Sequence, residues 1–167
     1  MAYIEINFPA GSWDYPTSNP APLDRDTGTN GGMRRQRFDD TTEEFVVLEP
    51  AFEVPDNIDS SGTVTFRAKG CAVTADGNEI QLKVSHSAKA EGESWDAAYG
   101  TVSSGDIVTD AQQDEMDEPE WTETVSNLGW VAKDLLRIMV SRIAIVGGTK
   151  VTGDWGMFNF KMRIPVT

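Results

Sequence analysis

Phe38-Asp39-Asp40-Thr41-Thr42-Glu43-Glu44 runs directly into Phe45-Val46-Val47-Leu48, and this stretch predicts a polar turn followed by a β-strand. Its first half is rich in Asp and Thr, whose side chains hydrogen-bond neighbouring backbone groups and hold a turn. After the turn, apolar residues keep one parity and so share one face of an extended segment; they are Val46, Leu48, Phe52 and Val54. Pro50 shares that parity and has no N–H to donate, so we expect an edge position or a bulge there.

Alternation of apolar and polar residues recurs along the rest of the chain. About eight such segments, separated by Gly, Pro and Asp turns, lie near residues 4–8, 45–54, 64–68, 80–86, 95–102, 121–125, 135–146 and 158–166. Part of the 135–146 run is apolar at both parities, which indicates a central strand. The pattern predicts an all-β protein, an antiparallel β-sandwich of jelly-roll type.

The N-terminal part differs in composition from the rest. Residues 12–32 are dominated by Pro, Asn, Asp, Thr and Gly, a composition that cannot pack as a regular element by itself. We therefore expect residues 1–33 to form a first strand and an extended arm, and residues 34–167 to form the sandwich, within a single domain. Trp13 and Tyr15 have three possible uses: an anchor on a neighbouring subunit, a stacking platform for a sugar, or a cover for the open edge of this chain's own sandwich.

Composition excludes several classes of function. The formal net charge of -13 argues against nucleic acid and against an anionic membrane surface, because both attract Lys and Arg. The longest apolar runs are far too short to span a membrane, and the N-terminus has no signal-peptide pattern, so synthesis in a cytoplasm is expected. The single cysteine, Cys71, forms no intrachain disulfide, and the single histidine, His86, leaves no Cys/His metal cluster.

The residues do not assemble into a catalytic site. With 27 acidic residues, some carboxylate pair always matches the spacing of a glycosidase, so such a pair indicates nothing, and we predict no enzyme, no catalytic residue and no cofactor. Residues 24–30 resemble a calcium loop, but its last ligand position falls on Arg35, which has the wrong charge. We expect a solvated loop at the acidic residues 106–120, a packed strand residue at His86 and a small buried hydrophobe at Cys71.

Several motifs resemble a family of small structural proteins of tailed bacteriophages. The family typically reads Phe-Asp-Asp-Thr-Thr-Asp-Glu where this chain has residues 38–44, and Val54-Pro55 stands where its following strand ends. Asp134-Leu135-Leu136-Arg137-Ile138-Met139-Val140-Ser141-Arg142 resembles a second family strand, and Gly153-Asp154 resembles its closing element. The chain departs from the family at Lys133, where Gly is usual, and in the acidic residues 106–120.

This resemblance implies a jelly-roll virion component. The first expectation is a non-enzymatic capsid decoration (cement) protein, a homotrimer made in the host cytoplasm and used on the outer capsid surface. It would bind the major capsid protein or other virion subunits and stabilise the shell by mass action. The candidate partner-contact residues are Trp13, Tyr15, Leu23, Arg34, Arg35 and Arg37. The three arginines have a second use, which is to neutralise Asp39 and Asp40 locally.

The alternative expectation is a carbohydrate- or receptor-binding module of a phage tail or head fibre. Jelly rolls commonly present aromatic side chains to sugars, and the aromatic residues available for this are Trp13, Tyr15, Trp95 and Trp121.

Overall fold

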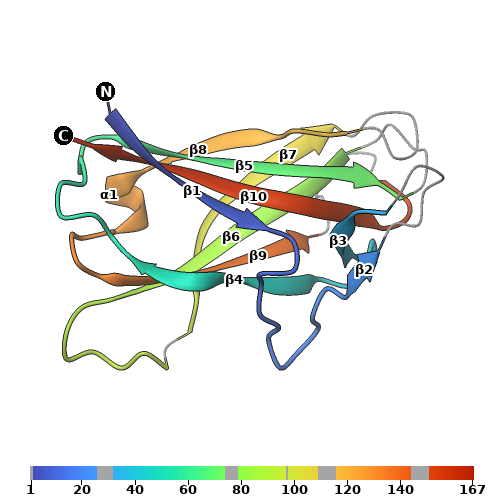
Figure 1. Ribbon diagram of the computed structural model, residues 1–167, viewed down its shortest axis with the longest axis horizontal. Coiled ribbons are helices and arrows are strands. Elements are labelled where there is room, and N and C mark those ends of the chain that lie inside the picture. The colour runs from blue at the N-terminus through green and yellow to red at the C-terminus, as the bar shows by residue number, and fades with distance from the viewer. Residues whose placement is uncertain (1, 26–31, 74–78, 97, 109–115, 144–150) are drawn as a thin grey trace.

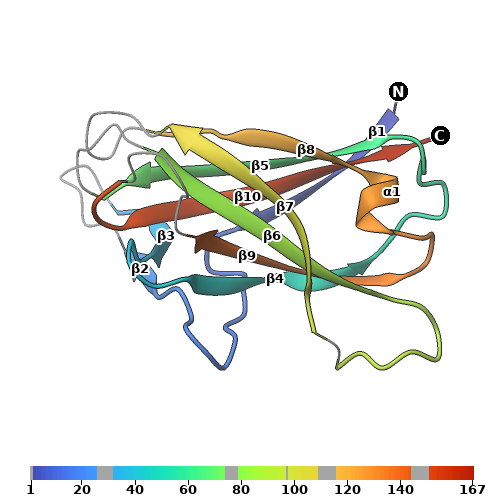
Figure 2. The same cartoon turned by 180° about the vertical axis from the view of Figure 1, so that it is seen from behind.

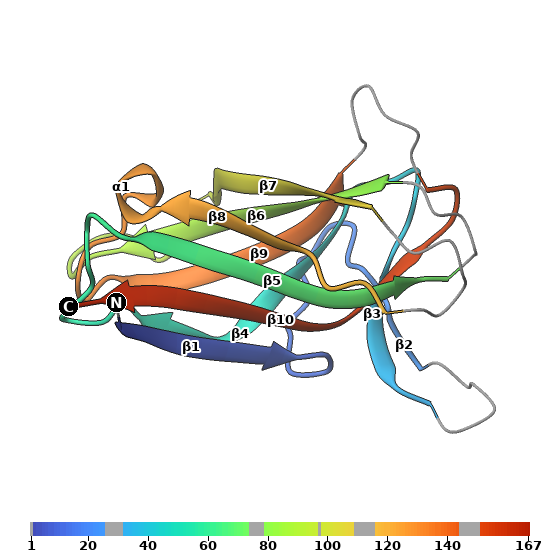
Figure 3. The same ribbon diagram turned by 90° about the horizontal axis from the view of Figure 1, so that it is seen from above.

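Two antiparallel β-sheets face each other across one hydrophobic core (Figures 1 and 3). The computed structural model describes residues 2–25, 32–73, 79–96, 98–108, 116–143 and 151–167. These residues form ten strands and a helix of four residues. The predicted all-β sandwich of jelly-roll type is therefore confirmed.

The larger sheet has six strands in the order β2-β3-β10-β5-β8, with β1 paired to β10 on the side of β3. Its strands are β1 (Ala2–Pro9), β2 (Leu23–Arg25), β3 (Arg34–Phe38), β5 (Thr63–Ala72), β8 (Glu120–Thr124) and β10 (Trp155–Val166). The smaller sheet has the order β4-β9-β6-β7, with strands β4 (Glu44–Glu53), β6 (Glu79–Lys89), β7 (Gly100–Val108) and β9 (Leu135–Ile143). Helix α1 (Val125–Leu128) follows β8.

Two details of the smaller sheet agree with the sequence patterns. Strand β9 lies between β4 and β6, as its apolar composition at both parities predicted. Strand β4 is at the edge of its sheet, and its pairing with β9 shifts register between Leu48 and Phe52. Pro50, which has no N–H to donate to a ladder, falls inside that shift.

The core is built from inward-facing residues of both sheets. The larger sheet contributes Phe66, Trp155, Phe160 and Met162, and the smaller sheet contributes Val46, Leu82, Ile138 and Val140. Burying a side chain of this size stabilises the folded state by about 1.5–3 kcal/mol. Phe158 is only half-buried, although its parity predicted a core position, because β10 shifts register between Met157 and Asn159.

The two described ends of the acidic segment, residues 106–108 and 116–120, differ from the solvated loop that its composition predicted, and residues 109–115 lie outside the described residues. Strand β7 runs into it as far as Val108, and Asp117 at its other end is buried. The Asp117 carboxylate accepts a hydrogen bond of 3.0 Å from the Trp155 indole, and its backbone N–H and C=O pair with Gly70. Asp117 therefore satisfies the one polar atom of a fully buried indole.

The N-terminal segment packs on this chain's own sandwich, which corrects the expectation of an extended arm. Backbone hydrogen bonds join Asp14 to Val47 and Ala21 to Phe45, so the segment lies along the outer edge of β4. Trp13 is 6% exposed and belongs to the core. Covering the open edge of the sandwich is thus the use that the structure shows for this segment, because an unpaired edge strand exposes backbone donors and acceptors.

Two further expectations concerned a calcium loop and a membrane span. Residues 26–30 of the segment compared with a calcium loop lie outside the described residues. No helix in the described part of the chain is long and apolar enough to cross a membrane.

His86 ties the smaller sheet to the connection that follows α1. The Trp130 indole N–H donates a hydrogen bond of 2.5 Å to His86 Nδ1, and the two rings lie 5.8 Å apart. Trp130 is 3% exposed. Burial lowers the pKa of His86 to about 4, because the protonated ring loses hydration there.

We expect the free energy of unfolding to fall on acidification between pH 6.5 and pH 5. In that range an unfolded histidine, with a pKa of about 6.5, binds a proton that the folded protein does not bind. The loss should reach about 1–2 kcal/mol, allowing for the partial exposure of the ring. Urea unfolding at pH 7, 6 and 5 measures it. The His86→Gln variant, which keeps an acceptor for Trp130, should lose most of this slope; an unchanged slope would assign it to other groups.

Candidate functional site

The Asp39–Glu44 turn is held by its own side chains, as its composition predicted. Asp39 Oδ1 accepts hydrogen bonds of 2.6–2.8 Å from the Thr41 hydroxyl, the Thr41 N–H and the Thr42 N–H. The Thr41 hydrogen bonds hold the pKa of Asp39 below its usual value. Glu44 accepts a hydrogen bond from the Asp39 N–H, and burial raises the pKa of Glu44. Hydrogen bonds among residues 39–44 therefore hold the turn.

Arg142 on β9 fastens this turn to the beginning of β10. It is 4% exposed and donates three hydrogen bonds, of 2.7–3.2 Å, to backbone oxygens of Phe38, Val151 and Gly153. A guanidinium carries five N–H donors in a fixed plane, so it can bind several carbonyls at once. Burial lowers the pKa of Arg142, and the nearby carboxylates oppose that effect.

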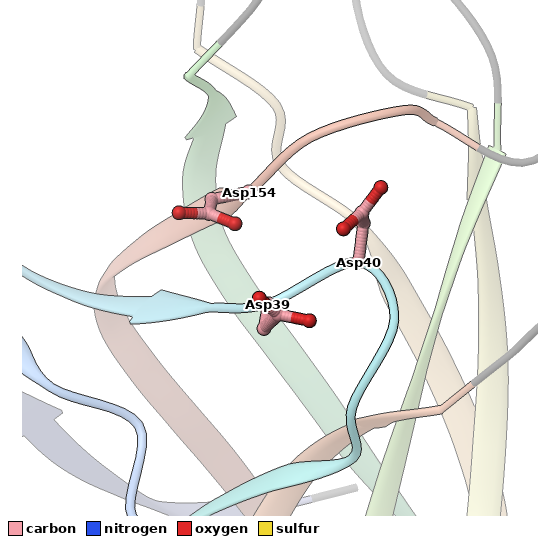
Figure 4. Close-up of side chains that lie close together, drawn as sticks. All are labelled: Asp39, Asp40 and Asp154. Atoms are coloured by element: carbon pink, nitrogen blue, oxygen red, sulfur yellow. The ribbon is translucent and has the colours of Figure 1, made fainter.

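Asp39, Asp40 and Asp154, whose charges act on Arg142, lie close together. Figure 4 shows the three aspartate side chains. Oxygens of Asp39, Asp40 and Asp154 lie within 4.8 Å of one another, next to a hollow of about 180 Å³ that Arg142 also lines. Asp40 accepts a hydrogen bond of 3.0 Å from the Gly153 N–H, and Asp154 forms an ion pair of 2.9 Å with Arg37. Because two arginines and several N–H groups already face these carboxylates, the cluster is a structural junction of β3, β9 and β10.

The arginines of β3 divide between this junction and the surface. Arg35 is 7% exposed, whereas Arg34 is exposed and Arg37 is half-buried. Arg35 and Arg37 both lie near Asp24, at 3.7 and 3.6 Å. Arg35 and Arg37 therefore lie near Asp24 and Asp154, whereas local neutralisation, one of the two expected uses, required them near Asp39 and Asp40. Arg142 is the cation beside those two aspartates. Partner contact is not available to the buried Arg35 and remains a prediction for Arg34 and Arg37.

A different kind of surface lies on the outer side of the smaller sheet. Figure 2 shows this sheet in front, with the β1–β2 and β6–β7 loops both projecting beyond β4. The outward parity of β6 and β9 mixes short and long side chains: Ser85, Ser87 and Ser141 are short, whereas Lys83, Arg137 and Met139 are long. The three serines are buried, so neighbouring groups already cover that part of the face.

An aromatic platform stands over this face, built from Trp95, Tyr99 and Arg137. Arg137 on β9 donates a hydrogen bond of 3.0 Å to the Trp95 carbonyl. Its guanidinium carbon lies 5.9 Å from the Trp95 ring centroid and 5.1 Å from that of Tyr99. Both distances allow a cation–π interaction, which holds the rings in place. Trp95 is nevertheless 69% exposed, the largest exposed fraction among the large hydrophobic residues that the structure describes.

The environment of Tyr99 places further groups near the platform. Burial raises the pKa of the Tyr99 hydroxyl, and the nearby Arg137 charge opposes this. The negative charges of Glu49 and Asp14 add to the increase. Glu49 lies on β4 and Asp14 pairs with Val47 of β4, so both acidic residues lie on the β4 side of Arg137.

The four aromatic residues proposed for sugar binding have different positions. Trp121 packs on Phe66 and Phe160, with ring centroids at 5.7 and 6.1 Å, and Trp13 is buried, so neither forms a platform. Trp95 and Tyr15 remain available at 69% and 43% exposed, and Leu23 is 39% exposed. Tyr99 and Arg137 were missed, because an arginine at an outward strand position shows no sign in the sequence of the rings that it will contact.

No protein-family model and no curated protein sequence matches this chain. Solved structures of similar fold include several carbohydrate-binding modules. The C-terminal CBM6 of LamC, a marine laminarinase from Zobellia galactanivorans, is 12% identical, with 95% of this chain and 98% of that chain covered and a TM-score of 0.52. CBM6cm-2 of Cellvibrio mixtus lichenase 5A, in complex with cellotriose, is 14% identical, with 94% and 95% covered and a TM-score of 0.53. CBM27-1 of Caldicellulosiruptor saccharolyticus, in complex with mannohexaose, is 9% identical, with 96% and 97% covered and a TM-score of 0.52. At these identities the likeness shows a shared fold.

Proposed function

We propose that this chain is a non-catalytic carbohydrate-binding module, with the glycan held on the outer face of the smaller sheet against Trp95. The observation that carries this proposal is an exposed indole fixed over a sheet face by Arg137. The shared fold with carbohydrate-binding modules supports it, since two of those were solved with cellotriose and mannohexaose.

The chemistry of the platform suits a sugar. One face of a pyranose ring presents C–H groups, which pack on an aromatic ring, while its hydroxyl groups remain free to hydrogen-bond. An indole supplies a large rigid contact area with few rotatable bonds, so binding orders little. Arg137 fixes the backbone oxygen of Trp95 before any ligand arrives, which lowers the ordering cost further.

The expected virion role depends on the sequence resemblance. Capsid decoration, trimerisation and a position on the outer shell were implied by the phage resemblance alone, and they stay predictions. The alternative reading, a carbohydrate-binding module, is the one that the platform and the comparisons support.

We expect saturable binding of at least one neutral oligosaccharide and loss of that binding on Trp95→Ala. Isothermal titration with cello-, xylo- and manno-hexaose tests this directly. Truncating a central aromatic contact should weaken binding at least about tenfold. Tyr3→Ala is the matched control, because Tyr3 is 50% exposed on β1 of the other sheet and should leave affinity unchanged. Absence of binding to all three sugars, or equal affinity after Trp95→Ala, would refute the proposal.

A further inference from the structure

The platform is bordered by more negative than positive charge. The β6–β7 loop that carries Trp95 also carries Glu91, Glu93 and Asp96, and all three are exposed. Asp14 and Glu49 belong to the neighbouring edge of the sheet: Asp14 pairs with Val47 of β4, and Glu49 lies on β4, which pairs with β9, the strand of Arg137. Carboxylates thus approach the platform both from the β6–β7 loop and from the β4 edge, and we call them the rim.

Backbone hydrogen bonds hold three of these carboxylates in place. Asp14, Glu49 and Glu93 accept hydrogen bonds from the backbone N–H groups of Tyr15, Ala51 and Ala90, at 2.8–3.1 Å. Each bond joins residues one to three positions apart, so it fixes the carboxylate relative to its own segment.

The cations on the same face are mostly engaged. Arg137 is held between two rings and the Trp95 carbonyl, and Lys83 is bonded to Glu43. Among the described residues of β6 and β9 that point outward, Lys89 is the remaining cation. A net negative potential over the platform follows, and the net charge of -13 on the whole chain reinforces it.

We infer that the Trp95 platform selects glycans without anionic groups and rejects those that carry carboxylate or sulfate. The inference rests on the proposed function, since it assigns a ligand class to the same face. The mechanism is like-charge repulsion, which discriminates between ligands that the aromatic stack alone would accept equally. The carboxylates of Asp14, Glu49 and Asp96 are the specificity-determining groups.

Ligand pairs with one backbone and different charge test the inference. One pair is hydroxyethyl cellulose and carboxymethyl cellulose; the other is unsubstituted xylan and glucuronoxylan. At about 20 mM salt, where screening is weak, affinity for the anionic member should be about fivefold lower. At about 0.5 M salt the difference should nearly vanish, while affinity for the neutral member stays constant.

Variants separate the rim from the overall charge. The triple variant Asp14→Asn, Glu49→Gln and Asp96→Asn should recover most of the fivefold loss and leave neutral binding unchanged. The matched control changes three distant carboxylates, Asp56→Asn, Glu118→Gln and Glu120→Gln, and should retain the discrimination although its net charge changes equally. The amide oxygens of Asn and Gln can still accept the backbone hydrogen bonds at positions 14 and 49. The control variant loses only surface ion pairs, which contribute little to stability, so both triple variants should fold.

The outcomes are distinguishable. Weaker binding of both anionic members, relieved by salt and by the rim variant, supports the inference. Equal or tighter binding of the anionic members overturns it and leaves the proposed function standing. Failure of every ligand to bind, together with failure of manno-hexaose, overturns the proposed function itself.

Discussion

Replacing Arg142 with Met is expected to destabilise the folded protein by about 3–5 kcal/mol. Met fills a similar volume but donates no hydrogen bond, so the carbonyls of Phe38, Val151 and Gly153 lose their partner. The three half-buried aspartates also lose a neighbouring cation, which adds to the cost. The midpoint of urea unfolding at pH 7, with its slope, measures the loss of free energy of unfolding.

Two further measurements make this prediction specific. Arg142→Lys keeps the charge but cannot reach three carbonyls from one planar group, so its cost should lie between those of wild type and Arg142→Met. The cost of Arg142→Met should shrink on acidification, because burial raises the pKa of Asp154 and its protonated form needs no cation. A loss below about 1 kcal/mol at pH 7 would show that water or rearranged side chains replace the guanidinium.

Gly70→Ala is expected to destabilise the protein by about 3 kcal/mol or more, at the upper end for overpacking. Gly70 lies on β5 opposite Met157 of β10, directly beneath the Trp155 indole. A methyl group there would stand 2.2 Å from Trp155 and 2.4 Å from the backbone oxygen of Gly156. The indole is fully buried and hydrogen-bonded to Asp117, so it cannot move away without breaking that bond. Thermal and urea unfolding give the change.

Gly100→Ala is the matched control for this substitution. The nearest atom to its added methyl group is the His86 backbone oxygen at 3.8 Å, an ordinary contact distance. Its effect should stay within about 0.5–1 kcal/mol. Similar stability for the two variants would mean that β5 and β10 can separate at Gly70, contrary to the close packing seen here.

The candidate site was only partly predictable from sequence. Trp95 could be named as an aromatic group for a sugar, but nothing local distinguished it from Trp121, which is partly buried and packs against the core. The difference arises because Trp121 lies on β8 with Phe66 of β5 opposite, whereas Trp95 lies on a loop. Its partner Arg137 is 42 residues away along the chain, beyond the reach of any spacing argument.

The all-β architecture follows from the sequence alone, because the side chains of a strand alternate between its two faces and this pattern can be followed residue by residue. The sequence also determines the Asp39 turn, whose hydrogen bonds join residues two or three positions apart. Other contacts form only in the folded chain. Trp13 is buried, Arg142 donates a hydrogen bond to Phe38 across 104 residues, and the Trp95 carbonyl accepts one from Arg137 of β9. These contacts depend on strand order and register, which are set by the packing of the whole core rather than by any local pattern.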